Sequence, residues 1–285
     1  MRERNSDHRR PGEPTRRVDR KAPGGNQFRG KGTGQPKAGR RHGARRGDDT
    51  VVLYGWHTVK AALENPQRHF RRLLATENAA RRLTEDQINF PVAPTLVRPE
   101  DIAAIAGAQA VHQGLYAEAD PLPSPELENV VADGIVLAID QITDPHNVGA
   151  ILRTAAAFGV TAVVTTERHS PEATGVLAKA ASGALEYVPI ATVVNLARAL
   201  DELRELNTFL VGLDSAGEAD LVATPLSAPL ALVIGAEGKG LRHLTRARCD
   251  VVARLALPGR ITSLNVSNAT AVALYVASGK LATPT

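Results

Sequence analysis

The chain has 285 residues, 43% of them hydrophobic, which is enough for one large domain or two ordinary ones with buried cores. Its net charge of +4 is uneven, because residues 1–49 hold 15 Lys/Arg against 6 Asp/Glu and the other residues hold 19 against 24. No apolar run approaches the roughly 18 to 20 residues that span a bilayer, no secretory signal is recognisable, and Cys249 has no second cysteine to pair with. We therefore expect a cytoplasmic protein with no membrane anchor.

Residues 1–49 are rich in Arg, Gly and Pro and contain almost no apolar side chains. Such a segment buries too little apolar surface to offset the entropy lost on ordering, so we expect it to be disordered. Its charge favours an electrostatic arm for an RNA phosphate backbone. A solubilising extension is the alternative that composition leaves open.

Residues 50–118 are predicted to form a small αβ domain. The pattern indicates a strand at 51–55, a helix after it, a second strand at 73–76, a helix at 101–106 and a last strand at 115–117. Residues 119–129 follow, with three prolines between positions 121 and 125, and these predict a stiff linker.

Residues 130–285 are predicted to form a larger α/β domain. Continuous apolar runs, typical of strands buried on both faces, occur at 135–140, 160–165, 208–213 and 230–235. Helical patterns lie between them at 148–158, 171–181 and 193–206. This alternation predicts a mostly parallel sheet with helices on both sides.

The first motif lies at residues 140–159, where a buried strand runs through an Asp-Pro turn into a helix. We expect Asn147 to be the N-cap of that helix, with its side-chain oxygen accepting a backbone N–H. Arg153 has only Gly and Ala as neighbours three and four residues away, which leaves its guanidinium uncovered. From the residues alone, Arg153 is equally well a ligand-binding group or an ordinary exposed helix arginine.

The second motif, residues 232–241, is an apolar strand that enters a loop with glycines at 235, 238 and 240. Glycine permits positive φ and a close approach of backbone to a ligand. The spacing matches neither the dinucleotide fingerprint nor the phosphate loop, and it leaves a nucleoside or adenosyl group open as the ligand. Glu237 could accept hydrogen bonds from that ligand or from a substrate, or only fix the loop, and an ordinary strand-to-helix turn is the alternative for the motif.

The third motif places Ser263, Asn265, Ser267 and Asn268 at the start of an otherwise apolar helix. One N-cap requires one such residue, so the surplus indicates donors and acceptors directed at a ligand or at neighbouring backbone. Cys249 has no His or Cys at metal-ligand spacing, and we expect an inert thiol and no metal site.

In this order and at these spacings, the three motifs resemble the SpoU (TrmH-like) branch of the knotted SPOUT RNA methyltransferases, over residues 134–280. The segments Tyr54-Gly55-Trp56-His57 and His112-Gln113-Gly114 resemble the L30e-like substrate-binding domain of the subgroup that methylates guanosine in 23S rRNA. One departure is Leu255-Ala256-Leu257-Pro258-Gly259, where the family usually has Ile-Pro-Met-x-Gly. We expect a locally altered loop there and retained activity.

The resemblance implies a trefoil knot formed by the last strand and helix, an obligate homodimer with the active site completed across its interface, and S-adenosylmethionine as cofactor. It implies that the cofactor is bound by Gly235, Glu237, Gly238, Leu255, Leu257, Ser263, Leu264 and Asn265. It also implies a catalytic face made of Asn147, Arg153, Glu237 and Asn265.

The expected function is therefore 2′-O-methylation of a ribose, that of a guanosine in 23S rRNA, either as naked RNA or in a pre-50S particle. A tRNA ribose methyltransferase and a non-catalytic knotted RNA-binding protein are the alternatives. A guanidinium is almost never deprotonated, so we expect Arg153 to stabilise the developing alkoxide or to hold the target phosphate rather than to act as a base.

Overall fold

The computed structural model describes residues 50–131, 134–168 and 174–282. The basic segment 1–49, for which we predicted disorder and RNA binding, lies outside the described residues.

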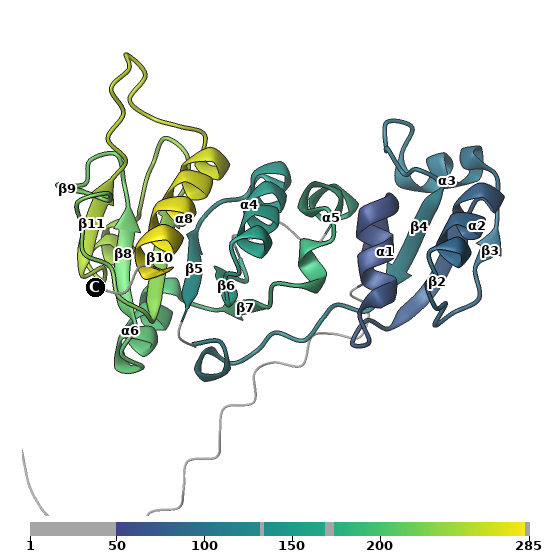
Figure 1. Cartoon of the computed structure of the whole chain (residues 1–285), viewed down its shortest axis with the longest axis horizontal. Helices are drawn as coiled ribbons and strands as arrows, with labels where there is room; N and C mark the ends of the chain where they lie inside the picture. Colours follow the sequence, from purple (N-terminus) through teal and green to yellow (C-terminus); the bar gives the residue numbers. More distant parts are fainter. Residues whose placement is uncertain (1–49, 132–133, 169–173, 283–285) are drawn as a thin grey trace, which may run out of the picture. The chain divides into compact units, whose positions relative to one another are not determined.

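A four-stranded mixed sheet with three helices forms the first part of the described chain (Figure 1). Its elements are β1 (Val51–Tyr54), α1 (Trp56–Glu64), β2 (Phe70–Ala75), α2 (Glu77–Glu85), β3 (Thr95–Leu96), α3 (Pro99–Ala106) and β4 (Leu115–Ala119). The strand order is β1-β4-β2-β3, with β4 antiparallel to both of its neighbours and β3 parallel to β2. The sequence predictions missed α2 and β3, because α2 buries only Ala79 and Leu83 and both residues of β3 are exposed.

A buried ion pair joins this first part to the rest of the chain. Arg68 donates from Nη2 to Glu186 Oε1 at 2.7 Å and from Nε to Glu186 Oε2 at 3.1 Å, and the two side chains are only 3% and 1% exposed. Asn65 donates to the same carboxylate, and the third guanidinium nitrogen of Arg68 donates to the Asp120 carbonyl. Both charged groups are therefore well supplied with partners despite their burial.

A seven-stranded sheet forms the second part, in the order β7-β6-β5-β10-β8-β11-β9, and every neighbouring pair in it is parallel. A short 3₁₀ turn at Leu127–Asn129 precedes it. Its elements are β5 (Ile135–Asp140), α4 (Pro145–Ala157), β6 (Ala162–Thr166), α5 (Gly175–Ala181), the 3₁₀ turn η2 (Ala184–Glu186), β7 (Ile190–Val193), α6 (Leu196–Glu205), β8 (Phe209–Leu213), β9 (Ala219–Asp220), β10 (Leu230–Gly235), α7 (His243–Arg246), β11 (Val251–Arg254) and α8 (Val266–Ala282). The predicted parallel α/β architecture is confirmed.

Three of these strands were not predicted, namely β7, β9 and β11. They are short and only partly buried, so they lack the continuous apolar run on which the prediction relied. The predicted helix at 193–206 is also too long at both ends, because Asn195 caps α6 through its side chain and Leu206 follows its last residue. Part of the predicted helix at 171–181 lies outside the described residues.

Helices cover both faces of the large sheet, and alternate residues of β5 contact the two layers. Ile135, Leu137 and Ile139 belong to the apolar core that includes α4 and α8. Val136 and Ala138 belong to the core that includes α6. This alternation is the period of two expected for a strand buried on both faces.

Helix α4 packs very closely on α5 (Figure 1). A Cβ added at Gly149 would lie 2.8 Å from the Leu177 carbonyl oxygen and 2.9 Å from the Ala181 nitrogen, closer than real Cβ contacts. Gly149 therefore permits a backbone-to-backbone contact that no other residue type would allow.

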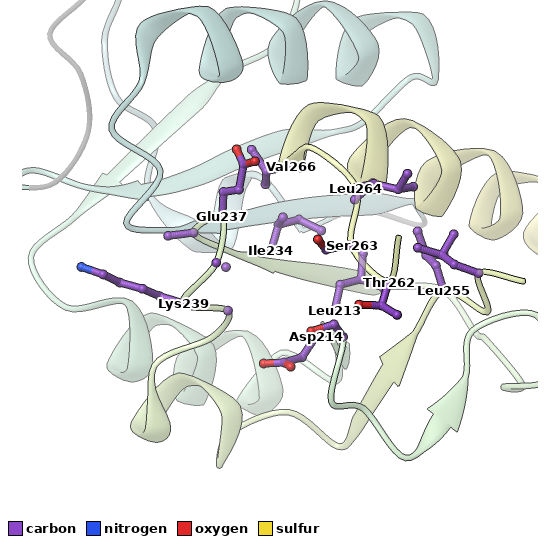
Figure 2. A pocket seen from close by; sticks show the side chains of 17 residues that line it. Leu213, Asp214, Ile234, Glu237, Lys239, Leu255, Thr262, Ser263, Leu264 and Val266 are labelled. Carbon is purple, nitrogen blue, oxygen red and sulfur yellow. The ribbon is translucent and has the colours of Figure 1, made fainter. Parts of the chain in front are cut away.

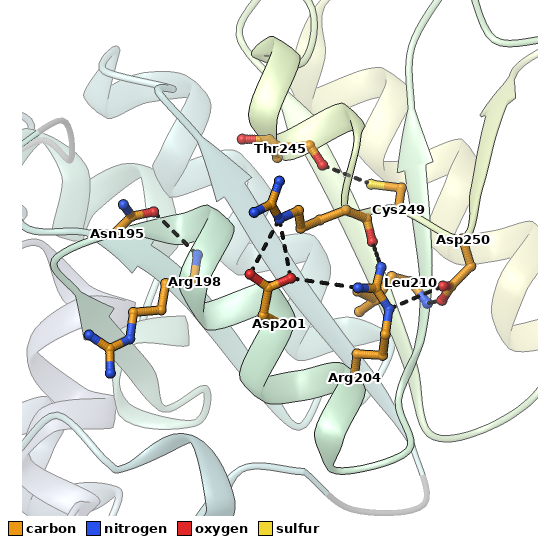
Figure 3. A network of polar contacts seen from close by, with 9 residues as sticks. Asn195, Arg198, Asp201, Arg204, Leu210, Thr245, Cys249 and Asp250 are labelled. Carbon is orange, nitrogen blue, oxygen red and sulfur yellow. Dashed lines mark hydrogen bonds and ion pairs between the residues drawn. The ribbon is translucent and has the colours of Figure 1, made fainter.

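A network of ion pairs fastens α6 to the turn between α7 and β11 (Figure 3). Arg248 donates to Asp201 at 3.2 Å, and Arg204 pairs with both Asp201 and Asp250. The Asp250 carboxylate also accepts from the Leu210 backbone N–H at 2.8 Å. The network holds the start of β11 beside β8, and β11 leads directly into the third motif.

Candidate functional site

The three neighbouring strands β8, β10 and β11 end at one edge of the sheet, where a cavity of about 420 Å³ opens (Figure 2). Leu213 of β8 lies in register with Ile234 of β10 and with Ala253 of β11, so the loops that follow must meet. Ligands of open α/β sheets bind in such crevices beyond the carboxyl ends of the strands.

Seven of the ten predicted site residues line this cavity, and these are Gly235, Glu237, Gly238, Leu255, Leu257, Ser263 and Leu264. The second and third motifs therefore lie together, although more than a dozen residues of intervening chain separate them. The leucines give the cavity an apolar wall, while Glu237 and Ser263 bring polar groups to its surface. Asn147, Arg153 and Asn265 are not among the lining residues.

The glycine loop, residues 235–240, has a backbone conformation that side chains at its three glycine positions would disfavour. A Cβ on Gly235 would lie 2.5 Å from the Leu241 nitrogen and still closer to Gly240. Gly238 and Gly240 have φ values of 75° and 64°, in the left-handed region that favours glycine. A backbone bridge between Ala236 and Gly240 closes the loop.

Two carboxylates, at the ends of the strands on either side of β10, hold the far side of this loop. Asp214, which follows β8, accepts from the Leu241 N–H at 3.3 Å, and Asp140, the last residue of β5, accepts from the Arg242 N–H at 3.1 Å. Each carboxylate also pairs with an arginine, Asp214 with Arg246 at 3.2 Å and Asp140 with Arg242 at 2.6 Å. The loop is thus fixed by protein contacts alone.

A polar cluster joins the first motif to the second and third. Asn265 Nδ2 donates to Asn147 Oδ1 at 2.9 Å and lies 3.5 Å from Glu237 Oε2, while Asn265 Oδ1 accepts from the backbone and hydroxyl of Ser267. The Asn265 amide is therefore fully used. Asn147 Nδ2 and the exposed Glu237 carboxylate keep capacity to bind a donor and acceptor group such as a hydroxyl.

The prediction that Asn147 is the N-cap of its helix is wrong. Asp144 occupies that position and accepts from the His146 N–H at 3.0 Å, with Pro145 at the first helical residue. Asp144 was predicted only as a turn residue, and an Asp before a proline satisfies both roles. Because Asp144 does the capping, the Asn147 side chain is available to Asn265.

Arg153 lies on the exposed face of α4 and does not line the cavity. Its neighbours Gly149, Ala150, Ala156 and Ala157 are small, as predicted, and no hydrogen bond or ion pair involves its guanidinium within the described residues. Within a single chain, Asn147 of the first motif therefore contacts the second and third motifs. Arg153 of the same motif lies outside the cavity and its polar cluster.

Several lining residues were missed by sequence reasoning, and the most informative are Asp214 and Ser215. They follow the predicted strand at 208–213 and match no motif. A topological argument could have found them, since residues just past the end of any parallel strand face the same crevice as the glycine loop.

The two short segments singled out in the small domain also meet in space. The Gln113 side chain, at a φ of 52°, accepts from the Trp56 N–H at 3.1 Å and from Lys179 Nζ at 2.8 Å. His112 Nδ1 accepts from the Gly114 N–H at 3.1 Å, so His112 has a structural role in this turn. Burial lowers the pKa of Lys179, because desolvation disfavours its charged form and no carboxylate offsets this effect.

Within residues 50–131, 134–168 and 174–282, no three His, Cys, Asp or Glu side chains gather as a metal site would require. Helices of sufficient length and hydropathy to cross a bilayer are likewise absent from this part of the chain. Burial raises the pKa of the Cys249 thiol to about 12, and its Sγ donates to the Thr245 carbonyl.

Comparison with known families gives two matches that divide the chain. Residues 134–275 match the SpoU rRNA Methylase family, and residues 52–125 match a family described as RNA 2′-O ribose methyltransferase substrate binding.

Among curated proteins, the chain has relatives that it matches over nearly their whole length. The chain is 40% identical over 238 residues to the 23S rRNA (guanosine-2′-O-)-methyltransferase RlmB of Pseudomonas aeruginosa, covering 78% of this chain and 94% of that protein. It is 37% identical over 242 residues to the enzyme of the same name from Escherichia coli, covering 79% of this chain and 97% of that protein.

Among solved structures, the SpoU methyltransferase AviRb from Streptomyces viridochromogenes, in complex with AdoMet, has a similar fold. The TM-score is 0.70 at 23% sequence identity, covering 81% of this chain and 90% of that one.

Proposed function

This chain belongs to the SpoU rRNA methylase family, and we propose that it transfers the methyl group of S-adenosylmethionine to the ribose 2′-hydroxyl of a guanosine in 23S rRNA. The observation that carries this proposal is the meeting of the cavity with the Asn147–Asn265–Glu237 cluster. A nucleoside-sized, partly apolar cavity ends beside groups that can bind a hydroxyl. The named activities of the relatives support the reaction and the substrate.

The cofactor would lie against the glycine loop, with its adenine between the leucines at 255, 257 and 264. The sulfonium carries its own leaving group, so the protein has mainly to align the ribose oxygen with the methyl carbon. In this arrangement the Glu237 carboxylate accepts a hydrogen bond from the 2′-hydroxyl, and Asn147 Nδ2 donates to an oxygen of the target nucleotide. Asn265 acts as a positioning residue, because its own amide is committed to Asn147, Glu237 and Ser267.

We propose that Arg153 completes the site of a second copy of the chain. Arg153 is exposed on α4, which packs against α8, and α8 exposes Val272 and Tyr275 at 43% and 72%. A homodimer that covered this α4–α8 face would bury those apolar side chains and deliver the guanidinium to the partner. There it would stabilise the developing alkoxide or hold the target phosphate.

A test of shared sites uses heterodimers of two inactive variants, Arg153→Ala and Glu237→Gln, purified through a different tag on each copy. If Arg153 acts across the interface, one of the two sites contains no substitution, and about half of the wild-type rate per dimer should return. A heterodimer as inactive as its parents would place Arg153 in its own chain's site instead. Tyr275→Asp should convert the dimer to a monomer in analytical ultracentrifugation.

The substrate is tested by mapping ribose methylation in rRNA and tRNA from cells with and without the gene. Loss of one 23S rRNA guanosine methylation supports the proposal, and loss of a tRNA methylation would overturn the substrate. Calorimetric titration with S-adenosylmethionine separates an enzyme from a non-catalytic RNA-binding protein, because the latter would show no binding. We also propose that the methylation takes place in the cytoplasm, where 23S rRNA is made.

Further parts of the proposal concern the fold. We propose that residues 50–118 are an L30e-like RNA-binding domain, that 119–129 are a linker, and that 130–285 are the catalytic domain. The match of 52–125 to a substrate-binding family supports the first part. We propose a trefoil knot in the last strand and helix. Its support is the path of the chain, which leaves β11 beyond β8 and returns to α8, packed on α4 and β10.

A further inference from the structure

Asp214 borders the cavity with a largely buried carboxylate. Among the charged residues that line it, Glu237 and Lys239 are exposed, whereas the Asp214 side chain is only 12% exposed. In Figure 2 Glu237 lies near the start of α8, and Asp214 lies on the other side of the cavity at the end of β8. Asp214 is therefore remote from the cluster at which methyl transfer is proposed.

The Asp214 carboxylate has one acceptor position to spare. Oδ1 accepts from the Ala216 N–H at 2.8 Å, and Oδ2 accepts from the Leu241 N–H at 3.3 Å and pairs with Arg246 at 3.2 Å. An ionised carboxylate has room for about four hydrogen bonds. Within the described residues, the fourth has no partner, and it belongs to a group that borders the cavity.

We propose that Asp214 accepts a hydrogen bond from a ribose hydroxyl of the bound S-adenosylmethionine. This rests on the proposed placement of the cofactor in the cavity. The neutral donors of the nucleoside are the two ribose hydroxyls and the adenine N6 amino group, and a carboxylate just past a parallel strand is a recurrent partner for the ribose hydroxyls in α/β folds. With the sulfonium directed to Glu237 and adenine covered by Leu255 and Leu264, the ribose comes between the two carboxylates.

Asp140 provides a matched control, since it is Asp214's counterpart on the glycine loop. Both carboxylates accept from consecutive backbone N–H groups, those of Leu241 and Arg242, and both pair with an arginine. The Asp140 side chain is 0% exposed and does not line the cavity. If Asp214 only supports the loop, substitutions at Asp214 and at Asp140 should therefore have the same effect. The loss of a contact to the ribose should follow only from substitution of Asp214.

The test is calorimetric titration of the full chain with S-adenosylhomocysteine and with its 2′-deoxy and 3′-deoxy ribose analogues. In the wild-type protein, at least one deoxy analogue should bind about tenfold or more weakly, as for a lost hydrogen bond to a charged group. Asp214→Asn should reduce that ratio, because a neutral amide oxygen accepts a weaker hydrogen bond than a carboxylate does, whereas Asp140→Asn should weaken all three ligands and keep the ratio. A wild-type ratio in Asp214→Asn overturns the inference.

Two further variants keep the outcome decisive. Should Asp214→Asn fail to fold by circular dichroism, Asp214→Glu retains the charge and the arginine partner but displaces the carboxylate, and it should also lose the discrimination. Leu264→Arg fills the cavity and should abolish binding of all three ligands. Wild-type affinity in Leu264→Arg would show that the cofactor lies elsewhere, which is distinct from failure at Asp214 alone.

Discussion

The Arg68–Glu186 ion pair makes the sharpest prediction about stability. Glu186→Gln removes the negative charge but keeps the shape, so the Arg68 guanidinium, 3% exposed, loses the carboxylate that compensates it. Breaking one partner of a buried pair costs about 3 to 5 kcal/mol, because the remaining charge is stranded away from water. At about 2 to 4 °C per kcal/mol for a protein of this size, the melting temperature should fall by roughly 10 °C.

Thermal unfolding followed by circular dichroism measures this loss, with Asp86→Asn as control. Asp86 pairs with Lys60 at 2.6 Å, but both side chains are substantially exposed. This variant should therefore have the same melting temperature as the wild type. The double variant Arg68→Met/Glu186→Leu should recover most of the stability, since neither charge is then buried. The reasoning is refuted if Glu186→Gln melts within about 2 °C of the wild type.

Two further predictions follow from the structure and one from the sequence. Gly235→Ala places a Cβ against Leu241 and should weaken S-adenosylmethionine binding by about 1 to 3 kcal/mol in calorimetry. Gly279→Ala is its control, because a Cβ there meets nothing within 4 Å, and affinity should not change. Burial holds the Cys249 pKa near 12, so at pH 8 only about one thiol in ten thousand is ionised, and iodoacetamide should label it in urea but not in the native protein. Equal labelling rates in both states would contradict this. Removal of residues 1–49, with their excess of Lys and Arg, should flatten the salt dependence of RNA affinity while the rate on saturating RNA stays unchanged; an unaltered slope would exclude the arm.

The long buried strands were predictable because burial on both faces leaves a continuous apolar run. Ile135–Asp140 and Leu230–Gly235 were predicted with their observed bounds. The short strand Val251–Arg254 was not, since its place in the sheet depends on pairing with Val211 and its neighbours and on the ion pair and hydrogen bond at Asp250. Such long-range contacts leave no period in the sequence.

The same distinction applies to the site. Glycine spacing and the surplus of polar residues before α8 indicated two of the cavity walls, because these signals are local. Asp214 lies in the third wall and gave no local signal, although it lines the cavity. The Asn147 cap was misassigned because Asp144 and Asn147 both have the right chemistry, and only the backbone at Asp144, extended at φ −72° and ψ 118°, decides between them.

The contact at Gly149 has a consequence for both of the sites to which α4 contributes. Helix α4 carries both Asn147 and Arg153, and at Gly149 it rests on the backbone of α5 and on the short Ala180 side chain, which has no rotatable group that could move aside. Sliding or tilting α4 by even a fraction of an ångström would force α5 to move with it. Asn147, assigned to this chain's own site, and Arg153, assigned to the site of a second copy, are therefore both held in place through the same contact with α5.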